Sequence, residues 1–278
     1  MPRSWFLRFG LLFGLVFLYG PIALLIFFSF NDIRSVTVWS GFSLRWYGEL
    51  FNNDQLLSAA WLSLRVAFIS ASGAVVLGTM AGLLLARFGA FRGRALFAGM
   101  ISAPLVMPEV ILGLSLLLLF VSLEQLTGWP QGRSMLTIIL AHITFTMAFV
   151  AVVVQSRLVS MDASLEEAAM DLGARPAKVF FVITLPIIAP AIVSGWLLAF
   201  TLSLDDLVIA SFVSGPGSTT LPMIVFSSVR LGVSPQINAL ATIVVLIVAI
   251  GILIAGILNH RAEKAKARDE QMAQQGGG

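Results

Sequence analysis

Residues 164–186 read SLEEAAMDLGARPAKVFFVITLP and interrupt a chain that is otherwise almost entirely apolar. Ser164 followed by Glu167 has the spacing of a capping box, so we predict that a short helix starts at Ser164. Its acidic residues fall near the helix N-terminus, where the helix dipole favours negative charge. Gly173 is predicted to end this helix, and Pro176 is well placed to begin a second one. The stretch therefore predicts two short helices that meet at an angle.

Each of these predicted helices has an apolar face. In the first helix, apolar side chains share one face at helical spacing: Leu165, Ala168, Ala169 and Leu172. The acidic side chains fall mostly on the opposite face: Glu166, Glu167 and Asp171. The second helix carries an apolar stripe: Val179, Phe180 and Ile183. Such a hairpin can lie on a membrane surface, or it can fit as a small alanine-rich knob into a groove on a partner protein.

The rest of the chain has the composition of a membrane protein. Of its 278 residues, 58% are hydrophobic and 11% are charged, whereas soluble domains usually carry roughly 25% charged residues. The basic residues are spread between apolar segments, so no nucleic-acid-binding face is predicted. The chain has no cysteine, which excludes disulfides, thiolate metal sites and cysteine catalysis. We predict one all-α transmembrane domain over residues 1–278, with six spans near 8–30, 62–86, 95–121, 135–157, 187–212 and 237–259.

An even number of spans places both termini on the same side of the membrane. If that side is the cytoplasm, its segments hold twelve basic residues: Arg3, Arg8, Arg87, Arg92, Arg94, Arg157, Arg175, Lys178, Arg261, Lys264, Lys266 and Arg268. The outer segments then hold four: Arg34, Arg45, Arg133 and Arg230. The positive-inside rule therefore predicts cytoplasmic termini. Residues 261–278 are predicted to form a flexible tail, and the aromatic residues of loop 31–60, Trp46 among them, to form an interfacial belt.

The quoted stretch also resembles a known signature. From Glu167 to Pro186 it reads E-A-A, three residues, G, nine residues, then I-x-L-P, which is typical of permease subunits of bacterial binding-protein-dependent ABC importers. Every position of that pattern is matched. The resemblance implies the type I importer permease fold, in which loop 160–186 holds the coupling helices that dock on the ATPase. Carried over by position, the coupling residues are Glu167, Ala168, Ala169, Gly173, Leu185 and Pro186.

Other stretches resemble the polyamine branch of that family, the putrescine and spermidine importers. They are SLRWYGELF (43–51), APLVMPEVILGLSLLLLF (103–120), TLSLDDLVIASFVSGPGSTTLP (201–222) and VSPQINALAT (233–242). The match is closest to the second, putrescine-type permease subunit. Related importers of other small solutes share much of these stretches, so such a solute is the alternative cargo.

This resemblance also implies the partners and the location of the chain. We expect a multi-pass protein of the bacterial inner membrane, surrounded by lipid and paired with a second, homologous permease. A periplasmic polyamine-binding protein is expected to deliver the solute, and an ATPase dimer to hold ATP and Mg²⁺. The chain contains no G-x-x-x-x-G-K-[ST] loop, so the ATPase has to be a separate chain. We predict no catalytic residue, metal or cofactor on this chain.

Three carboxylates fall within the predicted spans. Asp205 and Asp206 lie about 19 residues, or roughly 28 Å, beyond Pro186 along span five, and Glu109 lies near the middle of span three. Carboxylates in spans are usually functional, and a cationic solute needs such groups to replace part of its hydration. We predict that the three line the substrate path. The alternative is structural: the aspartates anchor a helix break, and Glu109 pairs with Arg65.

Two other function classes are open to the same residues. A polyamine–proton antiporter would use the buried carboxylates as proton carriers, but it leaves the signature loop unexplained. A serine hydrolase would need Ser115 and His142 to meet, and the site around Ser115 lacks the usual second glycine. We interpret His142 instead as a hydrogen-bond partner between helices.

Overall fold

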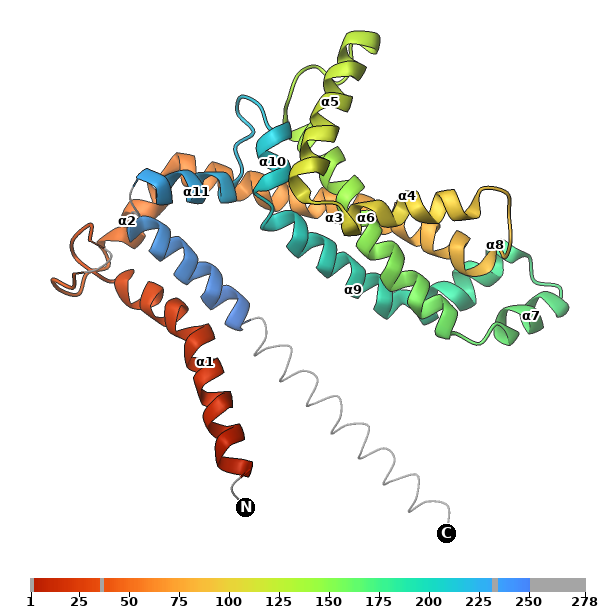
Figure 1. Cartoon of the computed structure of the whole chain (residues 1–278), viewed down its shortest axis with the longest axis horizontal. Helices are drawn as coiled ribbons and strands as arrows, with labels where there is room; N and C mark the ends of the chain where they lie inside the picture. Colours follow the sequence, from red (N-terminus) through yellow and green to blue (C-terminus); the bar gives the residue numbers. More distant parts are fainter. Residues whose placement is uncertain (1–2, 36–37, 232–234, 251–278) are drawn as a thin grey trace. The chain divides into compact units, whose positions relative to one another are not determined.

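The computed structural model describes residues 3–35, 38–231 and 235–250, and this part of the chain is helical without a β-strand (Figure 1). Five of its helices are long and apolar enough to cross a membrane: α1 (Arg3–Phe28), α3 (Asp54–Arg87), α5 (Glu109–Thr127), α6 (Met135–Ser160) and the continuous stretch Pro176–Leu204. The shorter helices are α2 (Arg45–Phe51), α4 (Arg94–Val106), α7 (Ser164–Asp171), α10 (Val208–Val213), α11 (Leu221–Leu231) and the segment Pro235–Ile250. This confirms the all-α, polytopic fold class.

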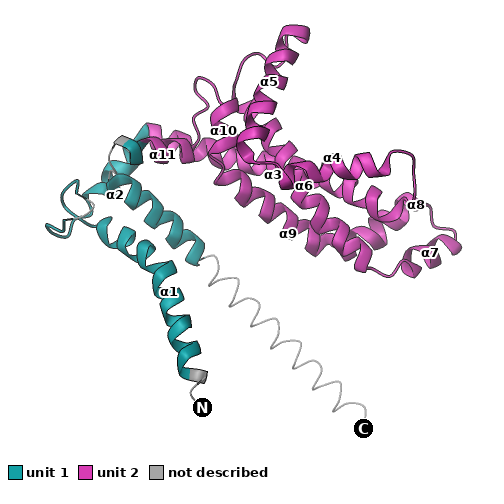
Figure 2. Cartoon of the chain, viewed as in Figure 1, with its two compact units in different colours: residues 1–54, 228–278 teal, residues 55–227 magenta. Residues whose placement is uncertain are grey.

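The chain divides into two compact units, residues 1–54 with 228–278, and residues 55–227 (Figure 2). The signature loop and the three carboxylates all belong to the second unit. That the whole chain acts as one transmembrane domain stays a prediction. The predicted tail 261–278 and the last part of the sixth predicted span lie outside the described residues.

Two predicted spans have wrong boundaries because helix breaks interrupt them. Span three, predicted over 95–121, is divided into α4 and α5 at Met107 and Pro108, whose backbones are extended. A proline disfavours helical backbone at the residue before it, so the break falls at this pair, although α4 accommodates Pro104. Span five, predicted over 187–212, begins earlier, at Pro176, and its helix ends at Leu204.

In the first unit, a buried tryptophan anchors the loop that follows α1. The side chain of Trp46 is 1% exposed, and its Nε1 donates a hydrogen bond to the Asn31 carbonyl at 2.5 Å. The expected interfacial role is therefore wrong for Trp46. Nearby, a hydrogen bond from Arg45 lowers the pKa of Glu49, and a second one from Gln236 lowers it further, because both stabilise the ionised carboxylate. These contacts join α2 to the helix Pro235–Ile250.

The second unit is built around α6, which packs against α4, α9 (Leu185–Leu204) and α10. Its contact with α3 is very close, because Gly78 and Gly82 face α6. A Cβ atom at Gly78 would lie 2.7 Å from the Val150 Cβ and 2.8 Å from the Met147 carbonyl oxygen. Any side chain at Gly78 therefore has to push α3 away from α6.

We expect Gly78→Ala to destabilise the second unit by about 1–3 kcal/mol, because overpacking a tight contact forces the backbones apart. The purified transporter in detergent should melt several degrees lower than wild type by intrinsic fluorescence. Gly99→Ala in α4 is the matched control, since a Cβ there meets nothing within 4 Å. Equal melting temperatures for the two variants would contradict the proposed close contact of α3 and α6.

Candidate functional site

The first helix of the signature loop starts where the sequence predicts, but its cap is different. α7 begins at Ser164, and the Ser164 amide donates a hydrogen bond to Oδ1 of Asp162 at 3.0 Å. This bond lowers the pKa of Asp162, because it stabilises the ionised carboxylate. Ser164 itself lies inside the helix, so the predicted capping box with Glu167 is wrong. The Glu167 amide, which the box would have paired with the Ser164 hydroxyl, donates instead to the Ala163 carbonyl at 3.1 Å.

The end of α7 explains the glycine of the signature. Gly173 has φ +85°, a left-handed conformation that side chains with a Cβ rarely adopt. Its amide donates to the Met170 carbonyl at 2.9 Å, and the Ala174 amide donates to the Ala169 carbonyl at 3.0 Å. These two bonds form a Schellman motif, which satisfies the last carbonyls of the helix. Gly173 therefore sets the angle at which the chain leaves α7.

The second helix begins at Pro176, as predicted, and is continuous with the long helix that follows. α8 (Pro176–Val179) runs through a π-helical turn, η1 (Phe180–Thr184), into α9. Leu185 and Pro186 are the first two residues of α9. The I-x-L-P part of the signature therefore marks the return from π-helical to α-helical geometry.

α7 presents its apolar face outward. None of its residues is buried. Leu165 is 48% exposed, and Leu172, which directly follows the helix, is 90% exposed. Of the predicted coupling residues, Glu167, Ala168 and Gly173 are exposed, Ala169 and Leu185 are half-buried, and Pro186 is exposed. An exposed apolar face marks a contact surface for a protein or a membrane, and this α7 face is our candidate docking surface.

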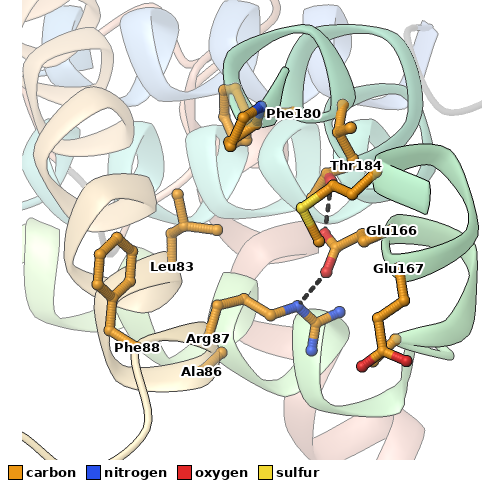
Figure 3. Close-up of a pocket in the computed structure, with 12 residues that line it drawn as sticks. Leu83, Ala86, Arg87, Phe88, Glu166, Glu167, Phe180 and Thr184 are labelled. Carbon is orange, nitrogen blue, oxygen red and sulfur yellow. Dashed lines mark hydrogen bonds and ion pairs between the residues drawn. The ribbon is translucent and has the colours of Figure 1, made fainter. Parts of the chain in front are cut away.

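The opposite side of α7 borders a cavity of about 510 Å³ next to the C-terminal end of α3 (Figure 3). The acidic side of α7 faces this cavity, as the helical spacing predicts: Glu167 lines it, and so does Glu166. The Glu166 Oε2 lies 2.7 Å from the Arg87 Nε, and its Oε1 accepts a hydrogen bond from the Thr184 hydroxyl at 2.5 Å. The Nε–H of Arg87 does not point at the carboxylate, so the Arg87 contact is an ion pair rather than a hydrogen bond.

The structure separates the three carboxylates by environment. Asp206 is buried, and its Oδ2 accepts a hydrogen bond from the Ala210 amide at 2.7 Å and lies 3.1 Å from the His142 Nε2. The His142 Nδ1 in turn lies 2.7 Å from the Ser203 hydroxyl. Asp206 thus caps α10 and links it to α6, and the interhelical role of His142 is confirmed. These three polar side chains span α6, α9 and the break before α10.

Asp205 and Glu109 are both exposed, and each lies at a helix break: Asp205 after α9 and Glu109 at the start of α5. Within the described residues, Glu109 forms no ion pair with Arg65, and His142 does not bond to Ser115. No cluster of three or more His, Asp or Glu side chains in that part of the chain is placed to hold a metal ion. Contact of the carboxylates with substrate stays a prediction.

Sequence reasoning missed Arg87 and Thr184 entirely, because neither belongs to the signature. Arg87 was counted only as a topology signal, and Thr184 occupies the unspecified position of I-x-L-P. The close contact of α3 with α6 did have a signal, since Gly78 and Gly82 have G-x-x-x-G spacing, a common helix-packing motif in membranes.

Comparison with known proteins identifies relatives over nearly the whole chain. The chain is 64% identical over 266 residues to the putrescine transport system permease protein PotI of Escherichia coli K12, covering 96% of this chain and 95% of that protein. It is 40% identical over 254 residues to the spermidine/putrescine transport system permease protein PotC of the same organism, covering 91% and 93%.

Solved structures of lower sequence identity share the fold. A bacterial alginate ABC transporter in complex with an alginate-bound periplasmic protein matches with a TM-score of 0.69 at 18% identity, covering 91% of this chain and 93% of that chain. The inward-facing MetNI methionine ABC transporter matches with a TM-score of 0.59 at 20% identity, covering 74% and 95%. Residues 74–268 match the family described as the binding-protein-dependent transport system inner membrane component, and the chain belongs to this family of importer permeases.

Proposed function

We propose that the chain is one permease subunit of an ATP-driven importer that moves polyamines, putrescine and/or spermidine, from the periplasm to the cytoplasm. The observation that carries the transport mechanism is the exposed apolar face of α7, which ends in the Schellman motif at Gly173. The names of the two relatives, at 64% and 40% identity, support a polyamine as the cargo.

The complex that we propose contains four kinds of chain. A second, homologous permease pairs with this one to form the path, and an ATPase dimer holds ATP and Mg²⁺ on the cytoplasmic side. A periplasmic polyamine-binding protein delivers the solute. Both termini of this chain lie in the cytoplasm, in agreement with twelve basic residues on that side against four outside. The chain binds no cofactor and performs no bond chemistry.

In this mechanism, ATP shifts the balance between two packings of the permease pair. Closure of the ATPase dimer moves α7, and this motion favours the outward-open packing, while hydrolysis restores the inward-open one. The exposed carboxylates Asp205 and Glu109 replace water around a cationic solute on its way through the membrane. Asp206 is already engaged by backbone amides and His142, so it supports the path rather than contacting the solute.

We expect ATP-dependent uptake of labelled putrescine into vesicles that hold this chain with its three partners, and loss of that uptake in Glu167→Lys. Glu167 lies in the first turn of α7 and lines the cavity with Arg87, so a positive charge at this position disturbs the helix that docks on the ATPase. Co-purification of the ATPase should weaken in parallel, while the expression of the permeases should not change. Uptake that follows a proton gradient and ignores this substitution would support the antiporter instead.

Gly173 allows a second test, one that separates backbone geometry from charge. Gly173→Val should reduce uptake strongly, because a left-handed conformation costs a β-branched residue about 1–2 kcal/mol and disturbs the end of α7. Gly173→Asn should keep most of the activity, since asparagine tolerates that conformation. Equal uptake by the two variants would show that the left-handed turn does not matter for coupling.

The path-lining role is tested by removing charge. Asp205→Asn and Glu109→Gln should each lower putrescine uptake, and Asp205→Glu, which keeps the charge, should retain more of it. The measurement is initial uptake rate against putrescine concentration, with ATPase activity as the control for assembly. Unchanged uptake in both neutral variants would remove the argument from charge to a cationic cargo.

A further inference from the structure

We propose that Glu166 is a positioning residue that connects the coupling helix to two long helices at once, through Arg87 to α3 and through Thr184 to α9. This inference rests on the proposed function, because it assigns a route to the motion that the ATPase imposes on α7. Glu166 precedes the E-A-A of the signature and faces away from the docking surface.

The first observation is that α7 has little other attachment through its own side chains. No residue of α7 is buried, and the cavity of about 510 Å³ separates part of its inner face from the end of α3. Glu166 reaches across this space, with 14% of its side chain exposed, to Arg87, whose side chain is 20% exposed (Figure 3). A partly shielded ion pair is weakened less by water and salt than an exposed one.

The second observation concerns the π-helical turn η1, which lies between α8 and α9. π-Helical turns are rare interruptions of α-helices and often mark functional sites. A displacement of α8 could be absorbed in such a turn before it reached α9. Glu166 bypasses the turn, because its Oε1 accepts the hydroxyl proton of Thr184, the last residue of η1, which is 1% exposed.

The third observation is that both helices lead to one segment at the far end of the unit. Along α3, Ser63 lies 24 residues, or about 36 Å, from Arg87, and its hydroxyl accepts the Leu221 amide at 2.8 Å. Along α9, Ser203 contacts His142, which contacts Asp206. Residues 205–221, which include Asp205, are thus attached to both α3 and α9, the two helices that Glu166 contacts through Arg87 and Thr184.

The contact of Glu166 with Arg87 and Thr184 is a strut, by which we mean a rigid link that stays closed through the transport cycle. Both carboxylate oxygens of Glu166 are engaged, so opening the contact would leave the buried Thr184 hydroxyl without its acceptor and the shielded Arg87 guanidinium without its counter-charge, which is costly. A persistent strut transmits motion in both directions, from α7 to the path and from the path back to α7.

The experiment measures putrescine uptake and ATP hydrolysis in the same vesicles that hold all four kinds of chain. Arg87→Glu and Glu166→Arg should each lower uptake per ATP by about tenfold, within the range for residues along a coupling network. The double variant, which exchanges the two charges, should recover uptake per ATP to near wild type. Thr184→Val should show an intermediate loss, and Arg92→Glu, an exposed charge change nearby, should show none.

A covalent replacement separates a strut from a contact that must open. The chain has no cysteine, so Arg87→Cys with Glu166→Cys provides a unique pair for a short bifunctional thiol reagent when the partner chains also lack cysteine. We expect the unlinked pair to be uncoupled and the linked pair to regain uptake. Loss of transport on linking, wild-type uptake per ATP in both single charge variants, or no recovery in the exchanged pair would each overturn the inference.

Different results would show that the proposed function itself is wrong. In that case wild-type uptake would not depend on ATP, or Glu167→Lys would be fully active, whatever the Arg87 and Glu166 variants do.

Discussion

A chain that crosses hydrocarbon must satisfy its own backbone hydrogen bonds, and this constraint governs where its helices can break. The break between α9 and α10 is possible because Asp206 accepts the backbone amides of Ile209 and Ala210. The break between α4 and α5 falls at Pro108, which has no amide to satisfy. At the loop end of α7, the Schellman motif pairs the last carbonyls. Each interruption of a helix thus has its own local solution.

These breaks also determine where charge can be placed. Glu109 and Asp205 lie at helix breaks and are exposed, whereas Asp206, one residue further along, is buried by the groups that it satisfies. Neighbouring acidic residues therefore have different roles. The same division appears on α7, where Glu167 is exposed on the signature and Glu166 is held by Arg87 and Thr184.

The sequence predicted the fold class and the signature loop well, because both depend on local patterns. Apolar length shows which segments can span a bilayer, and Gly173 and Pro176 mark a helix end and a helix start through backbone geometry alone. The sequence did not predict the contacts of individual side chains, because the same helical spacing is compatible with more than one packing. Helical spacing places Glu166 beside Glu167 on a polar face, but it does not say which side of a short helix meets the protein. The buried position of Trp46 was missed for the same reason.

By itself, the amino-acid sequence determined the helical membrane fold, the signature loop and the resemblance to importer permeases, since hydrophobic length and residue spacing are properties of the chain alone. Only the tertiary structure decided which charges meet. Arg87, Glu166 and Thr184 come from three separate segments. His142 comes from a different helix than its partners Ser203 and Asp206, which are close to each other in the sequence. Contacts of this kind depend on how helices pack, and local spacing carries no information about which residues of different helices meet.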